Sequence, residues 1–187
     1  MEKSVIHVEL INETEDSSVD QRRLVNAVQH VLQLESISSA EIGIAVIDDV
    51  RIHELNVQYL GHDYPTDVLS FPLSAQDQPL QGEIAVSLDT ARAQAARYGW
   101  SVQDELLLYV VHGTLHLAGY DDQDQASARR MHARQREVLV QLGLQPRDEP
   151  RRENDLPGSD LPGSDLSSNG AQNGSSGDVR SQWEEAT

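Results

Sequence analysis

Hydrophobic positions follow strand-like and helix-like spacings in turn along the first 143 residues of the chain. Short runs rich in β-branched residues predict four strands, at residues 6–10, 41–47, 67–72 and 83–88. Apolar residues at helical spacing, set between capping residues and glycines, predict five helices. Because the first half alternates strand and helix while the last third is helical, the pattern predicts an α+β fold. A small mixed four-stranded sheet would pack with about five helices.

Caps and apolar stripes make the helix predictions specific. The residues expected to begin helices all carry a side-chain oxygen that can accept a backbone N–H: Ser18, Asp49, Ser87 or Asp89, Ser101 and Asp124. Glycines are expected to end the last three helices: Gly99, Gly119 and Gly143. The side chains expected to face inward on the first, second and last helices are Leu24, Val28, Val31 and Leu32; Ile52, Leu55 and Tyr59; and Ala128, Met131, Val138 and Leu142.

The composition changes after Gly143. Residues 146–187 contain the near-tandem repeat Asp155-Leu-Pro-Gly-Ser and Asp160-Leu-Pro-Gly-Ser, then a stretch rich in Ser, Asn and Gly. Such a segment cannot bury enough apolar surface to offset the entropy of ordering it. We therefore expect one domain at residues 1–145 and a disordered acidic low-complexity tail at residues 146–187.

Charge and cysteine content narrow the class of protein. The chain of 187 residues carries 31 Asp and Glu against 14 Lys and Arg, a net charge of −17, and no cysteine. That charge argues against a broad basic surface for nucleic acid, although a local arginine cluster can still serve one groove. Without cysteine, any metal site must use histidine and carboxylate ligands. No apolar run reaches the roughly 18 residues of a membrane span and the N-terminus lacks a signal-peptide core, so a cytoplasmic protein is expected.

The strongest candidate for a functional site follows an apolar helical run at residues 106–111. His112 and His116 are four residues apart, so both imidazoles leave one face of the helix, one turn apart, and can share a metal ion. Gly119 can turn the chain back and bring Asp121 or Asp122 towards the same point. A histidine pair at this spacing more often binds nothing. Here the apolar helix favours a metal, because burying two imidazoles without partners is costly.

The remaining histidines carry less information. His7, His30, His53 and His132 stand alone on amphipathic elements, which is typical of partly exposed rings. His62 lies in a polar loop, where it can contribute a charge-dependent contact to a nearby site.

The histidine stretch resembles the signature of the YbeY family of bacterial metal-dependent endoribonucleases, His-Gly-x-Leu-His-Leu-x-Gly-Tyr-Asp-His. This chain has His112-Gly-Thr-Leu-His116-Leu-Ala-Gly-Tyr-Asp121-Asp122. A second family block is matched by Leu55-Asn-Val-Gln-Tyr-Leu60-Gly-His-Asp-Tyr-Pro-Thr-Asp67-Val-Leu-Ser-Phe-Pro72, and a third by Gly82-Glu-Ile. The three motifs occur in the family's order over about residues 5–143.

The resemblance implies a single-strand-specific, metal-dependent endoribonuclease that acts in 3′-end maturation of small-subunit ribosomal RNA and in ribosome quality control. It implies one zinc ion, or another divalent metal, held by His112, His116 and Asp122. The partners it implies are single-stranded ribosomal RNA, the small ribosomal subunit and a ribosomal protein, with no membrane.

Two positions depart from the family pattern. Asp122 stands where the third ligand is usually His, which lowers the net charge at the metal by one unit and makes bound water less acidic. Zinc accepts two imidazoles with one carboxylate, so metal binding is expected to survive. Leu60 stands where the family usually carries an active-site Arg, whose role therefore cannot be carried over.

If an arginine is needed to hold the scissile phosphate, another position must supply it. Arg51, Arg92 and Arg97 are the candidates nearest in sequence to the segments that form the site. The densest basic cluster lies on the last helix and either meets phosphates or forms a solvated face: Arg129, Arg130, Arg134 and Arg136.

Metal-assisted hydrolysis is the chemistry that follows from three ligands and an open position. Gly113 stands where His-Glu-x-x-His metallopeptidases carry their general-base Glu, so a peptidase would lack its base. Phosphodiester cleavage can use metal-bound hydroxide, a carboxylate or the 2′-OH of the RNA, and the sequence leaves these open. Asp67 is a candidate base or supporting partner, with capping of its own turn as the alternative.

The strand at residues 67–72 is expected to form one wall of a cleft opposite the histidine helix. Pro65 and Pro72 bracket it, as is typical of an edge strand. In a regular strand Ser70 points opposite to Leu69 and Phe71, towards the cleft.

The sequence supports three functional hypotheses, of which the nuclease leads. A metal-stabilised ribosome-assembly factor that binds the small subunit or a ribosomal protein without cutting is supported by Leu60 and by the acidic charge, which attracts basic ribosomal proteins. Hydrolysis of a non-RNA substrate is weakened by Gly113. RNA cleavage that disappears with a chelator and with loss of a ligand separates the first hypothesis from the second.

Overall fold

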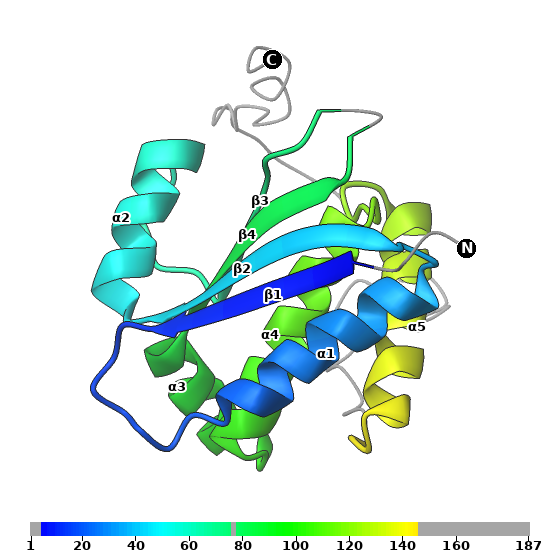
Figure 1. The fold of residues 1–187 in the computed structure, drawn as a ribbon. Coiled ribbons are helices and arrows are strands. Elements are labelled where there is room, and N and C mark those ends of the chain that lie inside the picture. The colour runs from blue at the N-terminus through cyan, green and yellow to red at the C-terminus, as the bar shows by residue number, and fades with distance from the viewer. Residues whose placement is uncertain (1–4, 76–77, 146–187) are drawn as a thin grey trace, which may run out of the picture. The chain divides into compact units, whose positions relative to one another are not determined.

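A four-stranded sheet lies at the centre of the described part of the chain. In the computed structural model, residues 5–75 and 78–145 are described, and Figure 1 shows their arrangement. The strands are β1 (Val5–Asn12), β2 (Ser39–Ile47), β3 (Val68–Pro72) and β4 (Leu80–Ser87). They form one sheet in the order β1-β2-β4-β3, with β3 antiparallel at one edge and the other pairs parallel. The predicted mixed four-stranded sheet, its central β2 and its edge strand are therefore confirmed.

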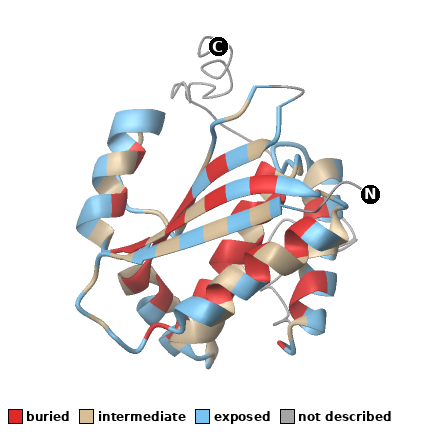
Figure 2. Cartoon of the chain, viewed as in Figure 1, coloured by how far each residue is buried: buried red, intermediate tan, exposed pale blue. Residues whose placement is uncertain are grey.

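Helices cover both faces of this sheet. They are α1 (Gln21–Leu34), α2 (Asp49–Leu60), α3 (Leu88–Tyr98), α4 (Val102–Leu117) and α5 (Gln125–Gln141). Ile42, Ile44 and Val46 of β2 face the large core, to which α1, α3, α4 and α5 contribute. On the opposite face α2 covers only one end of the sheet, around Ile47 and Ala85. Figure 2 shows the result, with buried residues concentrated on the sheet and α4 and few on α2.

All five predicted helices are present, but two of the predicted N-cap residues differ from the observed ones. Asp20, rather than Ser18, caps α1 by accepting the N–H of Arg23. Asp48, rather than Asp49, caps α2. Asp49 instead accepts hydrogen bonds from side-chain hydroxyls at the start of α3, which ties α2 to that helix. The remaining caps are as predicted, with Ser87 rather than Asp89 beginning α3: Ser87, Ser101 and Asp124.

Most of the expected inward side chains are buried. Leu55, Ala128 and Leu142 are half-buried, and only Tyr59 of this set is exposed. The four apolar stripe residues of α1, together with Ile52, Met131 and Val138, are buried. Tyr59 is 58% exposed and lies against the Phe71 ring at 5.1 Å, while the amide of Asn56 occupies the buried position on α2. The interior side of α2 is narrow, because only one end of the sheet lies beneath it.

The sequence also predicts that the chain lacks a membrane-spanning helix and ends in a disordered tail. None of the helices in the described residues is long and apolar enough to cross a membrane. The tail expected at residues 146–187 lies outside the described residues.

Candidate metal centre

The two histidines lie on the C-terminal half of α4. Its apolar side, which includes Val110, Val111 and Leu115, is buried in the large core. His112 and His116 emerge from the flank of the helix, and their side chains are 24% and 29% exposed. Burial therefore restricts both rings while leaving one side of each accessible.

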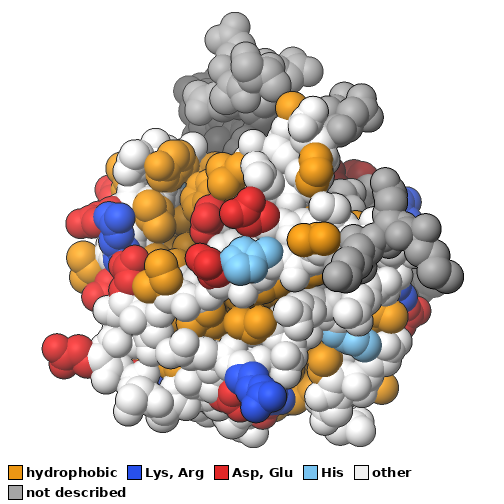
Figure 3. All heavy atoms as spheres, in the orientation of Figure 1, with side chains coloured by type: hydrophobic (Ala, Val, Ile, Leu, Met, Phe, Trp, Pro, Cys, Tyr) orange, Lys and Arg blue, Asp and Glu red, His pale blue; other side chains and the backbone are white. Residues whose placement is uncertain are grey.

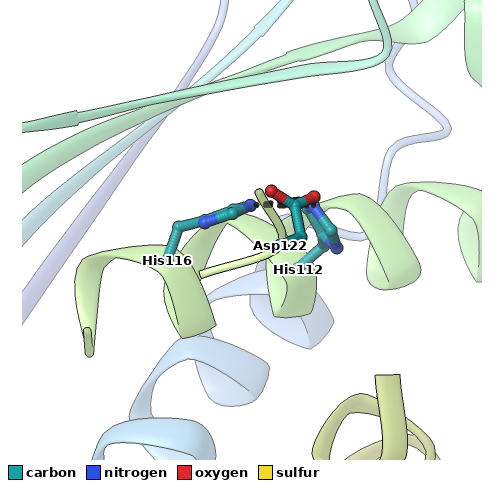
Figure 4. A group of neighbouring side chains, drawn as sticks. All are labelled: His112, His116 and Asp122. Atoms are coloured by element: carbon teal, nitrogen blue, oxygen red, sulfur yellow. Dashed lines mark hydrogen bonds and ion pairs between the residues drawn. The ribbon is translucent and has the colours of Figure 1, made fainter. Parts of the chain in front are cut away.

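The three predicted ligands converge on one point, as Figure 4 shows. The Nε2 atoms of His112 and His116 are 3.1 Å apart, and the ring planes lie at 78°. The Oδ2 atom of Asp122 lies 3.8 Å from His116 Nε2 and 4.0 Å from His112 Nε2. Ligand atoms at tetrahedral angles around a zinc ion lie about 3.3 Å apart for bonds of about 2.0–2.1 Å. The observed separations lie on either side of that value.

The opposite nitrogen of each ring is held by an oxygen acceptor. His112 Nδ1 donates to Gln135 Oε1 at 2.9 Å, and His116 Nδ1 donates to the carbonyl oxygen of Tyr120 at 3.1 Å. Because both Nδ1 atoms carry hydrogen, the two neutral rings turn their Nε2 lone pairs towards each other. That arrangement is favourable only with a cation or a proton between them. Histidine metal ligands commonly donate their other ring N–H to an oxygen in the same way.

Burial favours the neutral form of the His112 ring, in which the Nε2 lone pair is free. It is the largest influence on the pKa of His112 and lowers it below 6.5. The hydrogen bond to Gln135 opposes this effect, the neighbouring His116 adds to it, and the carboxylates of Asp67 and Asp122 oppose it. The net lowering of the pKa favours the neutral ring near pH 7, which is the form that can bind a metal.

The loop after α4 selects which aspartate faces the histidines. Gly119 has φ of +98° and turns the chain back. Asp121 then uses its carboxylate locally, accepting the N–H groups of Asp122 at 2.7 Å and Gln123 at 3.1 Å. Of the two candidates left open by the spacing, Asp122 is the one that lies beside the imidazoles.

Gly113 has a packing role between the two histidines. A Cβ atom at this position would lie 2.8 Å from Ser70 Oγ and 3.0 Å from a methyl carbon of Ile84. The helix thus approaches β3 and β4 more closely than any side chain would allow. Ser70 Oγ donates to the Gly113 carbonyl oxygen at 3.3 Å, so Ser70 faces α4 as predicted. A metallopeptidase Glu would not fit at this position.

Asp67 has the capping role considered for it, and its role as base or supporting partner stays a prediction. Its Oδ1 atom accepts the N–H of Val68 at 2.9 Å and the hydroxyl of Thr66 at 3.1 Å, so it caps the start of β3. Its charge also acts on His112 and raises the pKa of that ring. A carboxylate at the start of β3 therefore lies within electrostatic range of the candidate metal ligands.

The candidate arginines near the site segments bind other partners. Arg51 pairs with Glu54 at 3.0 Å, and Arg92 pairs with Asp16 at 2.7 Å and Asp89 at 3.1 Å. The guanidinium of Arg97 lies over the Tyr98 ring at 5.4 Å. In the structure these three guanidinium groups therefore contact other side chains.

Two arginines of α5 contact side chains other than the candidate ligands, and Leu60 is partly exposed at the end of its helix. Arg134 pairs with Glu35 at 2.6 Å and with Glu137 at 2.8 Å, which neutralises it. Arg130 donates to Ser127 Oγ. Leu60 ends α2 and is 40% exposed.

Gln135 and Glu35 are functional candidates that sequence analysis missed. Gln135 lies on α5 between buried Met131 and Val138, so a polar residue on an apolar stripe was the available signal. Glu35 accepts from the Tyr120 hydroxyl at 3.1 Å and from Arg134, and so anchors the ligand loop to the end of α1. No local pattern marks that contact.

Two histidines one turn apart, with a carboxylate on the following loop and a close-packed mixed sheet behind them, define a candidate α+β metalloprotein. The family model described as "Endoribonuclease YbeY" matches residues 9–143. The chain belongs to the YbeY family, which confirms the resemblance seen in the motifs.

Relatives and a solved structure agree with this assignment. The chain is 41% identical over 151 residues to an endoribonuclease YbeY from Desulfitobacterium hafniense, covering 72% of this chain and 96% of that protein. It is 43% identical over 129 residues to one from Pelotomaculum thermopropionicum, covering 65% and 85%. The solution structure of TM1509 from Thermotoga maritima is 29% identical with a TM-score of 0.51, covering 73% of this chain and 91% of that one.

Proposed function

We propose that the chain is a metal-dependent endoribonuclease that cleaves single-stranded RNA. Family membership supports an RNA-processing nuclease, since the relatives are named endoribonucleases. The observation that carries the metal dependence is the convergence of His112, His116 and Asp122. The substrate proposed is the 3′ end of small-subunit ribosomal RNA, with a further role in ribosome quality control.

The proposed metal is one zinc ion held by these three side chains. Two neutral imidazoles and one carboxylate form a ligand set that zinc accepts, with a fourth position left for water or substrate. When bound, such an ion polarises a phosphoryl oxygen and lowers the pKa of bound water. Because Asp122 adds a negative charge where the family usually has a neutral ring, another divalent metal is the alternative.

The surrounding residues have distinct proposed roles. Gln135 and the Tyr120 carbonyl keep both Nε2 atoms directed at the metal. Asp122, whose side chain is 43% exposed, leaves the solvent side open for the phosphodiester. Asp67, at the start of the strand that contacts the histidine helix, is the carboxylate we propose as acceptor of the nucleophile's proton.

The proposed partners are the small ribosomal subunit and one of its proteins. The net charge of −17 favours a basic ribosomal protein over a broad contact with RNA. Acidic side chains gather around a histidine on the face seen in Figure 3, where β1, β2 and β4 carry His7, Glu9, Glu41 and Glu83. Bacterial ribosomes lie in the cytoplasm, which is therefore the proposed compartment.

RNA cleavage tests this function directly. The full chain, with its metal content measured, is incubated with a labelled single-stranded RNA that carries a small-subunit 3′ end. We expect new internal ends that disappear with a chelator and in His112→Ala. Unchanged cleavage in either case, or no cleavage by metal-loaded protein, would contradict the proposal.

A conservative pair of variants guards against loss of folding. Asp122→Asn keeps the size of an exposed side chain and is expected to lose metal and cleavage. Asp121→Asn keeps an oxygen that can accept the N–H groups of the turn, and is expected to retain both. The opposite order would show that the wrong aspartate has been assigned.

A further inference from the structure

Exposed apolar side chains are concentrated on α2 and the loop that follows it. Of the large apolar residues exposed in the described part of the chain, the following belong to residues 50–64: Val50, Val57, Tyr59, Leu60 and Tyr64. Figure 3 shows hydrophobic side chains gathered where α2 lies in Figure 1. The metal ligands do not use this surface, and its exposure leaves it available to another molecule.

Two parallel rings mark the loop at residues 61–67. His62 and Tyr64 stack with their centroids 5.4 Å apart and their planes at 10°, and Tyr64 is 55% exposed. An exposed flat ring in this arrangement can stack on a nucleobase, the contact by which proteins commonly hold single-stranded nucleic acid.

The loop that carries the rings is held by its backbone. The buried amide of Asn56 donates to the Tyr64 carbonyl oxygen at 2.8 Å, and the N–H of His62 donates to the Asn56 carbonyl oxygen at 3.3 Å. Asp63 pairs with His53 at 2.8 Å. The backbone on both sides of the two rings is therefore held in place. The side chain of Tyr64 can be changed without removing these anchors.

The loop that carries the rings is followed by the strand that contacts the histidine helix. Two residues separate Tyr64 from Asp67, so their Cα atoms, three steps apart along the chain, are at most about 11 Å apart. Asp67 immediately precedes β3, and Ser70 of that strand contacts the carbonyl of Gly113 between the two histidines. The loop with the two rings therefore leads directly into the strand that contacts the histidine helix.

The acidic charge of the chain favours stacking over ionic contacts as the way to bind RNA. The chain has a net charge of −17, and Arg51, Arg92 and Arg134 are paired with carboxylates. A net negative charge disfavours a broad contact with phosphates, whereas stacking on a ring needs no positive charge. It contributes about 1–3 kcal/mol per base in other single-strand binders.

We propose that Tyr64, backed by the ring of His62, is a base-stacking subsite for a nucleotide near the scissile phosphate of single-stranded RNA. The inference rests on the proposed nuclease function and deepens it. Tyr64 supplies affinity for an unstacked base and so favours single strands over duplexes. Its contribution belongs to binding, and the metal ligands act independently of it.

A binding measurement tests the subsite without cleavage. The metal-loaded full chain is titrated into single-stranded DNA that contains 2-aminopurine, because stacking does not need a 2′-OH and a ribonuclease leaves DNA intact. Quenching of the base fluorescence reports stacking. We expect Tyr64→Ala to weaken binding about tenfold or more, Tyr64→Phe to bind like the wild type, and the duplex form to bind weakly.

Two further variants separate ring stacking from general apolar contact. Tyr64→Leu keeps an apolar side chain without a flat ring and is expected to behave like Tyr64→Ala. Tyr98→Ala removes a tyrosine from the end of α3 and is expected to leave binding unchanged. Wild-type affinity in Tyr64→Ala would overturn the proposal. Wild-type affinity in Tyr64→Leu would do so too, because it would show that DNA binds without a flat ring at this position.

Cleavage kinetics distinguish failure of the subsite from failure of the nuclease. With RNA as substrate, Tyr64→Ala is expected to raise KM with little change in kcat. RNA cleavage with no effect of Tyr64→Ala on KM or on DNA binding would overturn the subsite alone. Ring-dependent DNA binding without RNA cleavage would overturn the nuclease and leave the subsite standing.

Discussion

At the residue scale, the orientation of two imidazoles decides what the centre can bind. Gln135 and the Tyr120 carbonyl hold the Nδ1 atoms and thereby direct both Nε2 atoms to one point. Neither contact could be predicted from the sequence. The one from Gln135 joins residues 23 apart on different helices, and the one from Tyr120 uses a backbone atom.

Removing the Gln135 acceptor should loosen His112 without removing a ligand. We expect Gln135→Ala to weaken metal affinity about 10–100-fold, the usual effect of losing such a partner. Competition with a chromophoric chelator measures this. Arg129→Ala, an exposed substitution on the same helix, is the matched control. Equal affinity in Gln135→Ala and the control would contradict the role assigned to Gln135.

Burial of His112 predicts a pH dependence of stability in the metal-free protein. The pKa of the folded-state ring is lowered from 6.5. As the pH falls through 6.5, the unfolded chain therefore takes up a proton before the folded chain does. The contribution of His112 to the free energy of unfolding is therefore complete above pH 6.5. It is lost as the pH falls towards the pKa of the ring in the folded protein.

Urea unfolding between about pH 7.5 and pH 5 checks the sign. The wild type should lose stability on acidification more steeply than His112→Gln does. Parallel curves would show that the ring titrates alike in both states.

At the element scale, the closest contact is the approach of α4 to β3. A Gly→Ala change inside a helix usually stabilises it by about 1 kcal/mol. At Gly113 the added carbon would meet Ser70 Oγ and Ile84, so we expect Gly113→Ala to destabilise the fold by about 1–3 kcal/mol, as overpacking does. Denaturant unfolding measures this loss. Adding Ser70→Ala should recover part of it, and a net gain from Gly113→Ala alone would contradict the packing.

Local sequence patterns predict the helices and strands better than they predict the N-cap residues or the burial of single side chains. The four strands and five helices follow from apolar spacing over a few residues, which is a local property. The predicted N-cap residues of α1 and α2 are wrong because two possible acceptors lie close together in sequence at each helix start. Tertiary contacts decide between them, as the hydrogen bonds from Ser87 and Thr90 to Asp49 show. Tyr59 was placed inward because spacing does not reveal that α2 covers only one end of the sheet.

Candidate ligands were predictable where spacing on one helix determined them. His112 and His116 meet because residues four apart share a face. The choice between Asp121 and Asp122 needed the family pattern, since the turn after Gly119 determines which carboxylate is used locally. The structure brings Asp122 to the histidines and engages Asp121 in the turn.

At the scale of the whole molecule, the candidate centre depends only on elements that end before residue 146. Leu144 is 8% exposed and closes α5 through its bond to the Leu139 carbonyl. A chain that ends after Gln145 should therefore keep the metal content and melting temperature of the full chain. Metal analysis and thermal unfolding of both forms check this. Loss of metal on truncation would show that residues 146–187 support the centre.

Cleavage of RNA should depend on one metal ion held by His112, His116 and Asp122. The most direct test is the cleavage rate of a single-stranded RNA measured at graded metal occupancy, from metal-free protein to saturation. We predict that the rate rises in proportion to occupancy, reaches its plateau at one ion per chain, and stays at background in Asp122→Asn. Cleavage by metal-free protein at the rate of the loaded protein would contradict this dependence.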